Sequence, residues 1–416
     1  MSDPGWWAFE LPELTPGKPA TDAVFPASPA GLDYRAYLSL NTLLGCQSPL
    51  SAVPDERAFI VTHQLIELVF KLVIFDLAVI ARTMKQLAGS ASSSRELESV
   101  LECWDFWRPA LTASSRVRLS CKMTLPLLMR YVGVRSDGTS GNFDRVEFFR
   151  FREKLGTASG MQSAQFRLIQ RAFGKSPLLD MNVFPKPRAR PAFGHTLMSV
   201  TDPSIVPSDG DTASPKGDSI LADVARVDDL IHDVLTLYSV LNPCPVNAPI
   251  SAIDDCEFES ASTGLDRILA RTNETHSRVP PDGEMLNRFR SDLRQVIDRE
   301  NARRKVCAAA AAGAGYLKTM KPGSHLVRVL ARLASADRHL HGRHRGSLLS
   351  THLRVARNAL HAPVSRSREN IDANTAPGIG GATIAYLGFM RRHLIPLFPA
   401  LIAFQQSAPP QAAAAN

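Results

Sequence analysis

Apolar residues recur at spacings of three and four along most of this chain, and the alternating pattern of a half-buried strand hardly occurs. A spacing of three and four places apolar side chains on one face of a helix. The pattern predicts helices within five segments, which are 57–87, 100–132, 148–173, 220–241 and 285–305. We therefore expect an all-α fold.

Two proline-rich stretches interrupt this helical pattern. Residues 1–31 predict an extended arm, because proline lacks the N–H donor that a helix interior requires. Residues 185–218 predict a long loop, interpreted as an insertion over the surface rather than a boundary between domains. Residues 404–416 are rich in Ala, Pro and Gln and are expected to be a disordered tail. One helical domain over 32–403 is the resulting prediction.

Charge and cysteine content narrow the classes of protein. The chain has 48 Lys and Arg against 40 Asp and Glu, a net charge of +8, with both signs interspersed. This small net charge argues against nucleic acid as a partner, because nucleic-acid binding requires clustered positive charge. The six cysteines have no metal-site spacing and are expected to be reduced thiols. No run reaches the roughly 18 apolar residues of a membrane span, and the first residues lack a secretory pattern, so we expect a cytoplasmic protein without a membrane partner.

A first candidate site lies in the apolar segment around His63. Phe59, His63 and Glu67 follow one another at intervals of four, so they share a helix face. A partly desolvated histidine beside an aromatic ring favours its neutral form and could act as a base or hydrogen-bond acceptor. The alternative is a structural histidine that is hydrogen-bonded to Glu67.

A second candidate lies where a helix carrying Phe148 and Arg152 runs into the small-residue turn that contains Ala158 and Ser159. The guanidinium of Arg152 could hold a carboxylate through two parallel hydrogen bonds. The alternative is a helix–loop–helix connection with a surface ion pair.

A third region, 325–361, is rich in histidine. His339, His341 and His344 suggest zinc, but no Cys or closely spaced carboxylate accompanies them and the nearby arginines oppose a cation, so a solvated basic face is favoured. His352 instead has apolar neighbours at helical spacing, which suits ligation of a buried planar cofactor. The glycine loop from Gly378 to Gly381 is not a dinucleotide fingerprint, because no strand precedes it; it predicts close backbone approach to a ligand, or a lid.

Three motifs in this order resemble the tryptophan 2,3-dioxygenase family. They are Tyr34-Arg-Ala-Tyr37, then Phe59-Ile-Val-Thr-His63-Gln-Leu-Ile-Glu67, and then Phe148-x-x-x-Arg152 followed by Ala158-Ser159-Gly160-x-Gln162-Ser-x-Gln165-Phe-Arg. The resemblance implies a large helical bundle with a buried heme b pocket, assembled as a homotetramer or homodimer. It also implies an enzyme that uses ferrous heme and O2 to cleave the C2–C3 bond of the indole of L-tryptophan, giving an N-formylkynurenine-type product.

The resemblance assigns roles residue by residue. His63 resembles the histidine that meets the indole N–H, and Phe59 and Phe148 resemble the rings that pack on the indole. Arg152 resembles the clamp on the substrate carboxylate. His352 best matches the axial ligand of the heme iron, with His344 as second choice, because Leu348 and Leu349 replace the Trp-Arg expected before the ligand.

Five further positions complete the assignment. Tyr34 and Tyr37 match the helix that a neighbouring subunit contributes to the pocket, and Ala158 and Ser159 match the loop near bound oxygen. Ile379 replaces the threonine that contacts the substrate ammonium group in the family. That replacement leaves two outcomes: an enzyme that opens L-tryptophan with a weaker amine contact, or one that acts on a modified tryptophan or indole, by monooxygenation or ring rearrangement. A heme-free binding protein on the same scaffold is the non-enzymatic alternative.

Overall fold

The computed structural model describes residues 33–90, 93–131, 145–155, 163–174, 221–242, 308–342 and 344–361, with the single positions 291, 294, 298, 301 and 404. Its elements in chain order are the helices α1 (Tyr34–Tyr37), α2 (Leu40–Gly45), α3 (Pro54–Ser90), α4 (Ser94–Glu102), α5 (Trp104–Leu119), the π-helix η2 (Ser120–Thr124), α6 (Leu125–Tyr131), α7 (Arg145–Arg152), the 3-10 turn η3 (Glu153–Leu155), α8 (Ala164–Ala172), α11 (Val227–Leu241), α14 (Ala308–Met320), α15 (His325–His341) and α16 (Leu348–His361).

The described residues contain no strand, which confirms the predicted all-α class. The segment expected at 57–87 is helix α3, whereas 100–132 and 148–173 are each divided into shorter helices. The proline-rich stretches 1–31 and 185–218 lie outside the described residues, and 285–305 is described only at isolated positions. Within the described ranges, no helix is long and apolar enough to cross a membrane.

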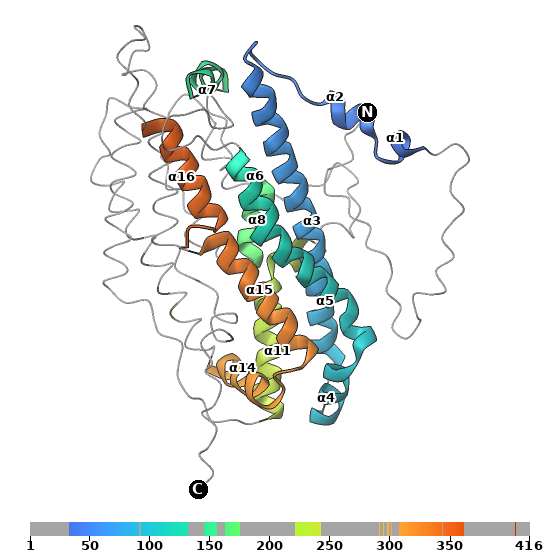
Figure 1. The fold of residues 1–416 in the computed structure, drawn as a ribbon. Helices are drawn as coiled ribbons and strands as arrows, with labels where there is room; N and C mark the ends of the chain where they lie inside the picture. The colour runs from blue at the N-terminus through green and yellow to red at the C-terminus, as the bar shows by residue number, and fades with distance from the viewer. Residues whose placement is uncertain are drawn as a thin grey trace.

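Helix α3 is the central element of the fold. Its 37 residues give a rod about 55 Å long at ~1.5 Å per residue. It packs against α5, α6, α8 and α11, and in Figure 1 these helices run beside one another with α15 and α16. The buried carboxylate of Asp76 on α3 accepts hydrogen bonds from the guanidinium of Arg116 on α5, with Nε 3.1 Å from Oδ1, which ties the two helices together.

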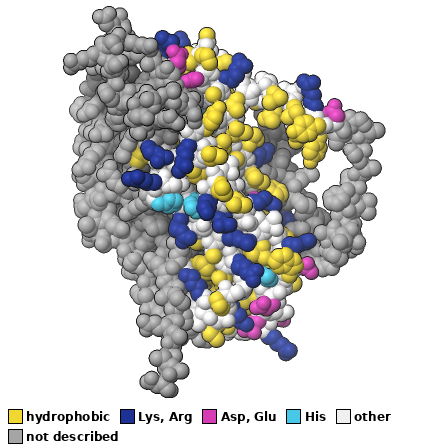
Figure 2. Space-filling model, viewed as in Figure 1, with side chains coloured by type: hydrophobic (Ala, Val, Ile, Leu, Met, Phe, Trp, Pro, Cys, Tyr) yellow, Lys and Arg dark blue, Asp and Glu magenta, His cyan; other side chains and the backbone are white. Residues whose placement is uncertain are grey.

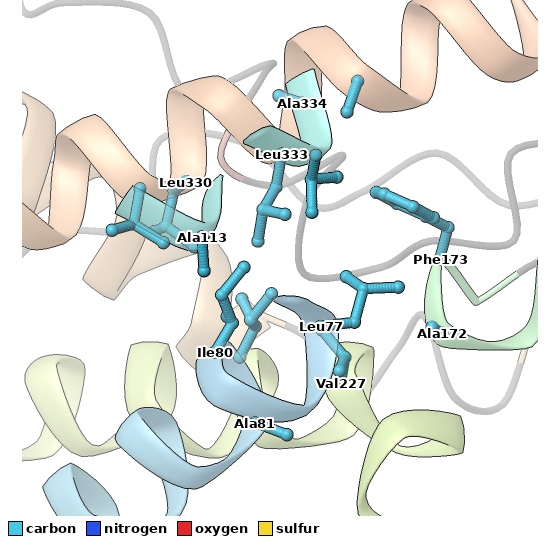
Figure 3. Close-up of a cluster of buried hydrophobic side chains, with 14 of the residues drawn as sticks. Leu77, Ile80, Ala81, Ala113, Ala172, Phe173, Val227, Leu330, Leu333 and Ala334 are labelled. Carbon is cyan, nitrogen blue, oxygen red and sulfur yellow. The ribbon is translucent and has the colours of Figure 1, made fainter. Parts of the chain in front are cut away.

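The main core lies where α3, α5, α8, α11 and α15 meet. Figure 3 shows apolar side chains from these helices converging on one another, and all of them are buried: Leu77, Ile80, Ala81, Ala113, Ala172, Phe173, Val227, Leu330, Leu333 and Ala334. Burial of this apolar surface is the principal stabilising term of such a fold.

Helices α5 and α6 form one rod with a π-helical turn, Ser120–Thr124, between them. The amide of Leu125 donates to the carbonyl of Ser120, five residues back. Pro126 follows directly, and a proline both lacks an N–H and crowds the carbonyl four residues before it. A widened turn relieves that crowding, which explains why the regular helix gives way here.

Candidate active site

The site begins with Phe59 and His63 on adjacent turns of α3. The Nδ1 atom of His63 lies 2.8 Å from the carbonyl oxygen of Phe59, and the two ring centroids are 4.0 Å apart. A carbonyl only accepts, so Nδ1 carries the proton and Nε2 is left as an acceptor. Burial lowers the pKa of His63, and the Phe59 carbonyl and the Glu67 carboxylate oppose that shift. The imidazole is therefore neutral near pH 7.

The alternative of a hydrogen bond between His63 and Glu67 is not what the structure shows. The Oε2 atom of Glu67 accepts from Nε2 of Gln165, at 2.9 Å, and the same amide donates to the backbone carbonyl of Glu67 at 3.0 Å. Gln165 is buried on α8. It holds the carboxylate on the helix, one turn beyond His63. We had assigned no role to Gln165 from the sequence.

An aromatic cluster lies beside His63. The Phe59 ring centroid is 6.1 Å from that of Phe148 and 5.4 Å from that of Phe151, both on α7. Phe148 and Phe151 meet edge to face at 5.3 Å, an arrangement that aromatic quadrupoles favour. Val53, Ala58 and Leu155 pack around them. Phe151 is fully buried; sequence reasoning missed it, although its spacing of three from Phe148 signals a shared face.

Of the other residues predicted to line the substrate pocket from the same subunit, the structure describes the helix position of Arg152 alone. Arg152 is the last residue of α7, one turn beyond Phe148. The positions of Ala158, Ser159 and Ile379 lie outside the described residues.

The N-terminal tyrosines lie away from the aromatic cluster, on the surface. Tyr34 and Tyr37 of α1 are 74% and 71% exposed. The segment after α2 is nevertheless fixed to α3 close to His63, because Nε2 of Gln47 donates to Oε1 of Gln64 at 2.8 Å.

His352 stands on the second turn of α16. Its ring is partly buried, and none of the hydrogen bonds found among the described residues involves it. Burial and the neighbouring His63 lower the pKa of His352 to about 4. The two imidazoles, from opposite ends of the sequence, are thus electrostatic neighbours. A neutral imidazole is the form that ligates a metal.

His344, the second choice, has a different setting. It lies exposed on the turn between α15 and α16. Its Nε2 is 2.9 Å from the carbonyl oxygen of Arg338, and its Nδ1 accepts from the amide of Gly346 at 3.2 Å. Both ring nitrogens are engaged by backbone, so an iron ligand at this position would require the turn to open.

The remaining histidines of the region do not form a metal centre. The Nδ1 of buried His341 is 2.9 Å from Oδ1 of Asp337, one turn back on α15. Within the described part of the chain, no group of three or more His, Cys, Asp or Glu is placed to hold a metal ion. Buried His341 departs from the solvated basic face that the sequence predicts, whereas His344 is exposed.

In this helical protein one neutral imidazole, His63, thus lies beside an aromatic cluster, and it acts electrostatically on a second neutral imidazole, His352. The sequence model of the tryptophan 2,3-dioxygenase family matches residues 19–103, which contain the first of the two imidazoles and Phe59. This part of the chain is therefore similar to that family, as its motifs predicted.

Individual relatives support the same resemblance. Tryptophan 2,3-dioxygenase of Bradyrhizobium diazoefficiens is 34% identical over 149 residues, covering 34% of this chain and 42% of that protein. The enzyme of Anaeromyxobacter sp. is 29% identical over 184 residues, or 44% of this chain and 58% of the relative. Tryptophan 2,3-dioxygenase of Anopheles gambiae is 36% identical over 152 residues, which cover 35% of this chain and 33% of that protein. The matches therefore span only 33% to 58% of these relatives.

Proposed function

We propose that this protein is a heme-dependent oxygenase that inserts O2 across the indole C2–C3 bond of L-tryptophan or a close derivative. The observation that carries the proposal is the position of His63, whose ring lies against Phe59 in the aromatic cluster with Phe148 and whose charge influences His352. The similarity to tryptophan 2,3-dioxygenases supports the same reaction class.

His352 is the proposed axial ligand of heme b. Its donor chemistry fits: the ring is neutral near pH 7, partly buried, and outside every hydrogen bond found among the described residues. His344 fits less well because its two nitrogens already meet backbone groups. A ferrous heme held there would supply the activation of O2.

The substrate is proposed to lie against Phe59 and Phe148, with its indole flat between apolar groups. Arg152, one turn beyond Phe148, would hold the carboxylate through a bidentate contact. Such an arrangement lowers the barrier mainly by positioning. Ala158 and Ser159 are proposed to line the side at which O2 reacts, and Ile379 to face the substrate amine.

His63 is proposed to receive the hydrogen bond of the indole N–H. Its Nδ1 proton is committed to the Phe59 carbonyl, so Nε2 presents a lone pair. The neutral form that burial favours is the form that can accept.

We further propose a homotetramer or homodimer in which a neighbouring subunit's α1 reaches this pocket. The exposed rings of Tyr34 and Tyr37 support that assembly. So does an exposed apolar row at helical spacing on α3, comprising Val61, Leu65, Leu68 and Leu72, because such rows usually mark interaction surfaces. A cytoplasmic location remains a prediction from the sequence.

Isotope labelling tests the reaction. The purified ferrous protein should convert L-tryptophan under labelled O2 into N-formylkynurenine that bears two labelled oxygens. One labelled oxygen, or turnover only of a substituted indole, would instead favour the monooxygenating or rearranging alternative. Absence of a Soret band after hemin reconstitution would favour a heme-free binding protein.

A further inference from the structure

Cationic side chains gather where α5 and η2 pack against α15. Figure 2 shows Lys, Arg and His side chains forming a band across this face of the molecule. We term the cationic cluster the groups that act on one another in this region, which are Arg118, Lys122, Arg328, Arg332, Arg338, His339 and His344. They come from α5 and η2 on one side and from α15 and the turn after it on the other, so the cluster is a product of tertiary packing.

Side-chain contacts fix the middle of the cluster. The Nη1 atom of Arg332 on α15 donates to the carbonyl oxygen of Leu111 on α5, at 2.7 Å. Arg118 follows Leu111 by seven residues and so lies on the same face of α5, two turns further on. On α15, His339 follows Arg332 by the same interval. The guanidinium of Arg118 therefore lies opposite the stretch of α15 between Arg332 and His339.

The charges of these groups act on one another. Burial and the positive charges of Arg118 and Arg328 lower the pKa of Arg332. Burial, His344, Lys122, Arg338 and Arg118 lower the pKa of His339. Arg118 is common to both sets, which places it at the centre of the cluster.

None of the ion pairs found among the described residues involves the cationic cluster, and the buried carboxylate of Asp337 on α15 is paired with His341. Two lysines elsewhere are paired: Lys85 lies 3.1 Å from Asp223, and Lys321 lies 3.6 Å from Glu98. By contrast, the Nε atom of Arg118 is buried and donates to no acceptor among the described residues. Like charges held together in a partly buried place destabilise the fold unless an anion compensates them.

We propose that the junction of α5 and α15 at Arg118 binds a phosphate group of a small molecule. Two guanidinium groups present planar forks that match phosphate oxygens, and Lys122 adds a point charge beside them. Because Arg118 and Arg332 are partly buried at a helix junction, the donors converge on one compact place. That convergence favours a phosphate or diphosphate over a nucleic-acid backbone, which requires charges spread along a track.

The cluster is separate from the proposed heme and substrate pocket. Besides burial, the groups that influence the pKa of His63 are the Phe59 carbonyl and Glu67, and the group that influences the pKa of His352 is His63. None belongs to the cationic cluster. The inference therefore stands or falls independently of the oxygenase activity.

Calorimetric titration of the purified protein with inorganic pyrophosphate tests the site. At low salt, saturable binding to one site per chain is expected, and Arg118→Gln should weaken it at least tenfold. Lys122→Gln should weaken it less, because a point charge is more easily replaced by its neighbours. The matched control is Arg95→Gln on α4, which removes one exposed positive charge elsewhere and should leave the affinity unchanged.

The proposal fails if pyrophosphate does not bind, or if Arg95→Gln weakens binding as much as Arg118→Gln, since that result indicates only the average charge. Tighter binding of a single-stranded DNA oligonucleotide than of pyrophosphate, lost equally in Arg118→Gln, would overturn it in favour of nucleic acid. Helical circular dichroism should be unchanged in each variant, which separates loss of the site from loss of the fold. A second variant, Arg118→Lys, keeps the positive charge and should retain partial affinity.

Discussion

The imidazoles of His63 on α3 and His352 on α16 are electrostatic neighbours, although 288 residues lie between them in the sequence. Each ring is partly buried and neutral near pH 7. The Nδ1 proton of His63 is donated to the Phe59 carbonyl, whereas His352 takes part in none of the hydrogen bonds found among the described residues. Two such rings can serve different roles in one pocket, as acceptor and as ligand.

Heme binding should depend on His352 and not on His344. His352→Ala removes the proposed axial nitrogen, so the Soret band of the reconstituted protein should shift and its hemin affinity should fall at least tenfold. His344→Ala should retain both, because that ring is turned to backbone partners on an exposed turn. Absorption spectroscopy during hemin titration makes the comparison. A normal spectrum in His352→Ala and a lost band in His344→Ala would reverse the assignment.

Loss of the His63 ring should slow turnover more than it weakens binding. His63→Ala removes the acceptor for the indole N–H, and we expect kcat to fall about 10²-fold, the low end of what a positioned acid–base group contributes. Steady-state rates with L-tryptophan and 1-methyl-L-tryptophan provide the measurement. The methylated substrate lacks the N–H, so His63→Ala should lower the rate with it less than the rate with L-tryptophan. An equal loss on both substrates would assign His63 a packing role against Phe59.

The charge of Glu67 should set the acidic limb of the pH–rate profile. The Glu67 carboxylate raises the pKa of His63 against the effect of burial. Glu67→Gln removes that charge, so the pKa of His63 falls further and the neutral ring persists to lower pH. The acidic limb of the kcat/KM profile should move to lower pH in this variant. An unmoved limb would mean that another group controls the profile.

The sequence predicted the parts of this site that depend on spacing within one helix. Phe59 and His63 share a face because they are four residues apart, and their rings do meet. It could not predict that Gln165, 98 residues away from Glu67, holds the carboxylate, because that contact depends on how α8 packs on α3.

The choice between two histidines also lay beyond the sequence. The hydrogen-bond partners of His344 are backbone groups, whose positions depend on how the turn between α15 and α16 folds. The cationic cluster was likewise hidden, because the average charge of a chain does not reveal that α5 and α15 bring Arg118 and Arg332 together. Tertiary packing, rather than local pattern, decides each of these features.

Acid should destabilise the heme-free protein through His352. An unfolded histidine has a pKa near 6.5, whereas the folded pKa of His352 is about 4. As pH falls below 6.5 the unfolded chain takes up a proton that the folded chain does not, so stability declines until the folded ring also protonates near pH 4. The loss from this group between pH 7 and 5 should be about 2 kcal/mol. Urea unfolding at both values measures it, and His352→Gln should reduce the decline; an identical decline in that variant would exclude His352 as its source.

Close packing of α14 on α11 should make two glycines of one helix respond oppositely to the same substitution. A Cβ atom at Gly313 would fall on the carbonyl oxygen of Leu235, whereas a Cβ atom at Gly315 would meet nothing within 4 Å. Gly313→Ala must therefore push the two backbones apart and should cost about 2–3 kcal/mol. Gly315→Ala should stabilise the protein by about 0.5–1 kcal/mol, because alanine loses less backbone entropy in a helix. Urea denaturation midpoints of the two variants make the test, and equal midpoints would show that α14 does not pack on α11 in this register.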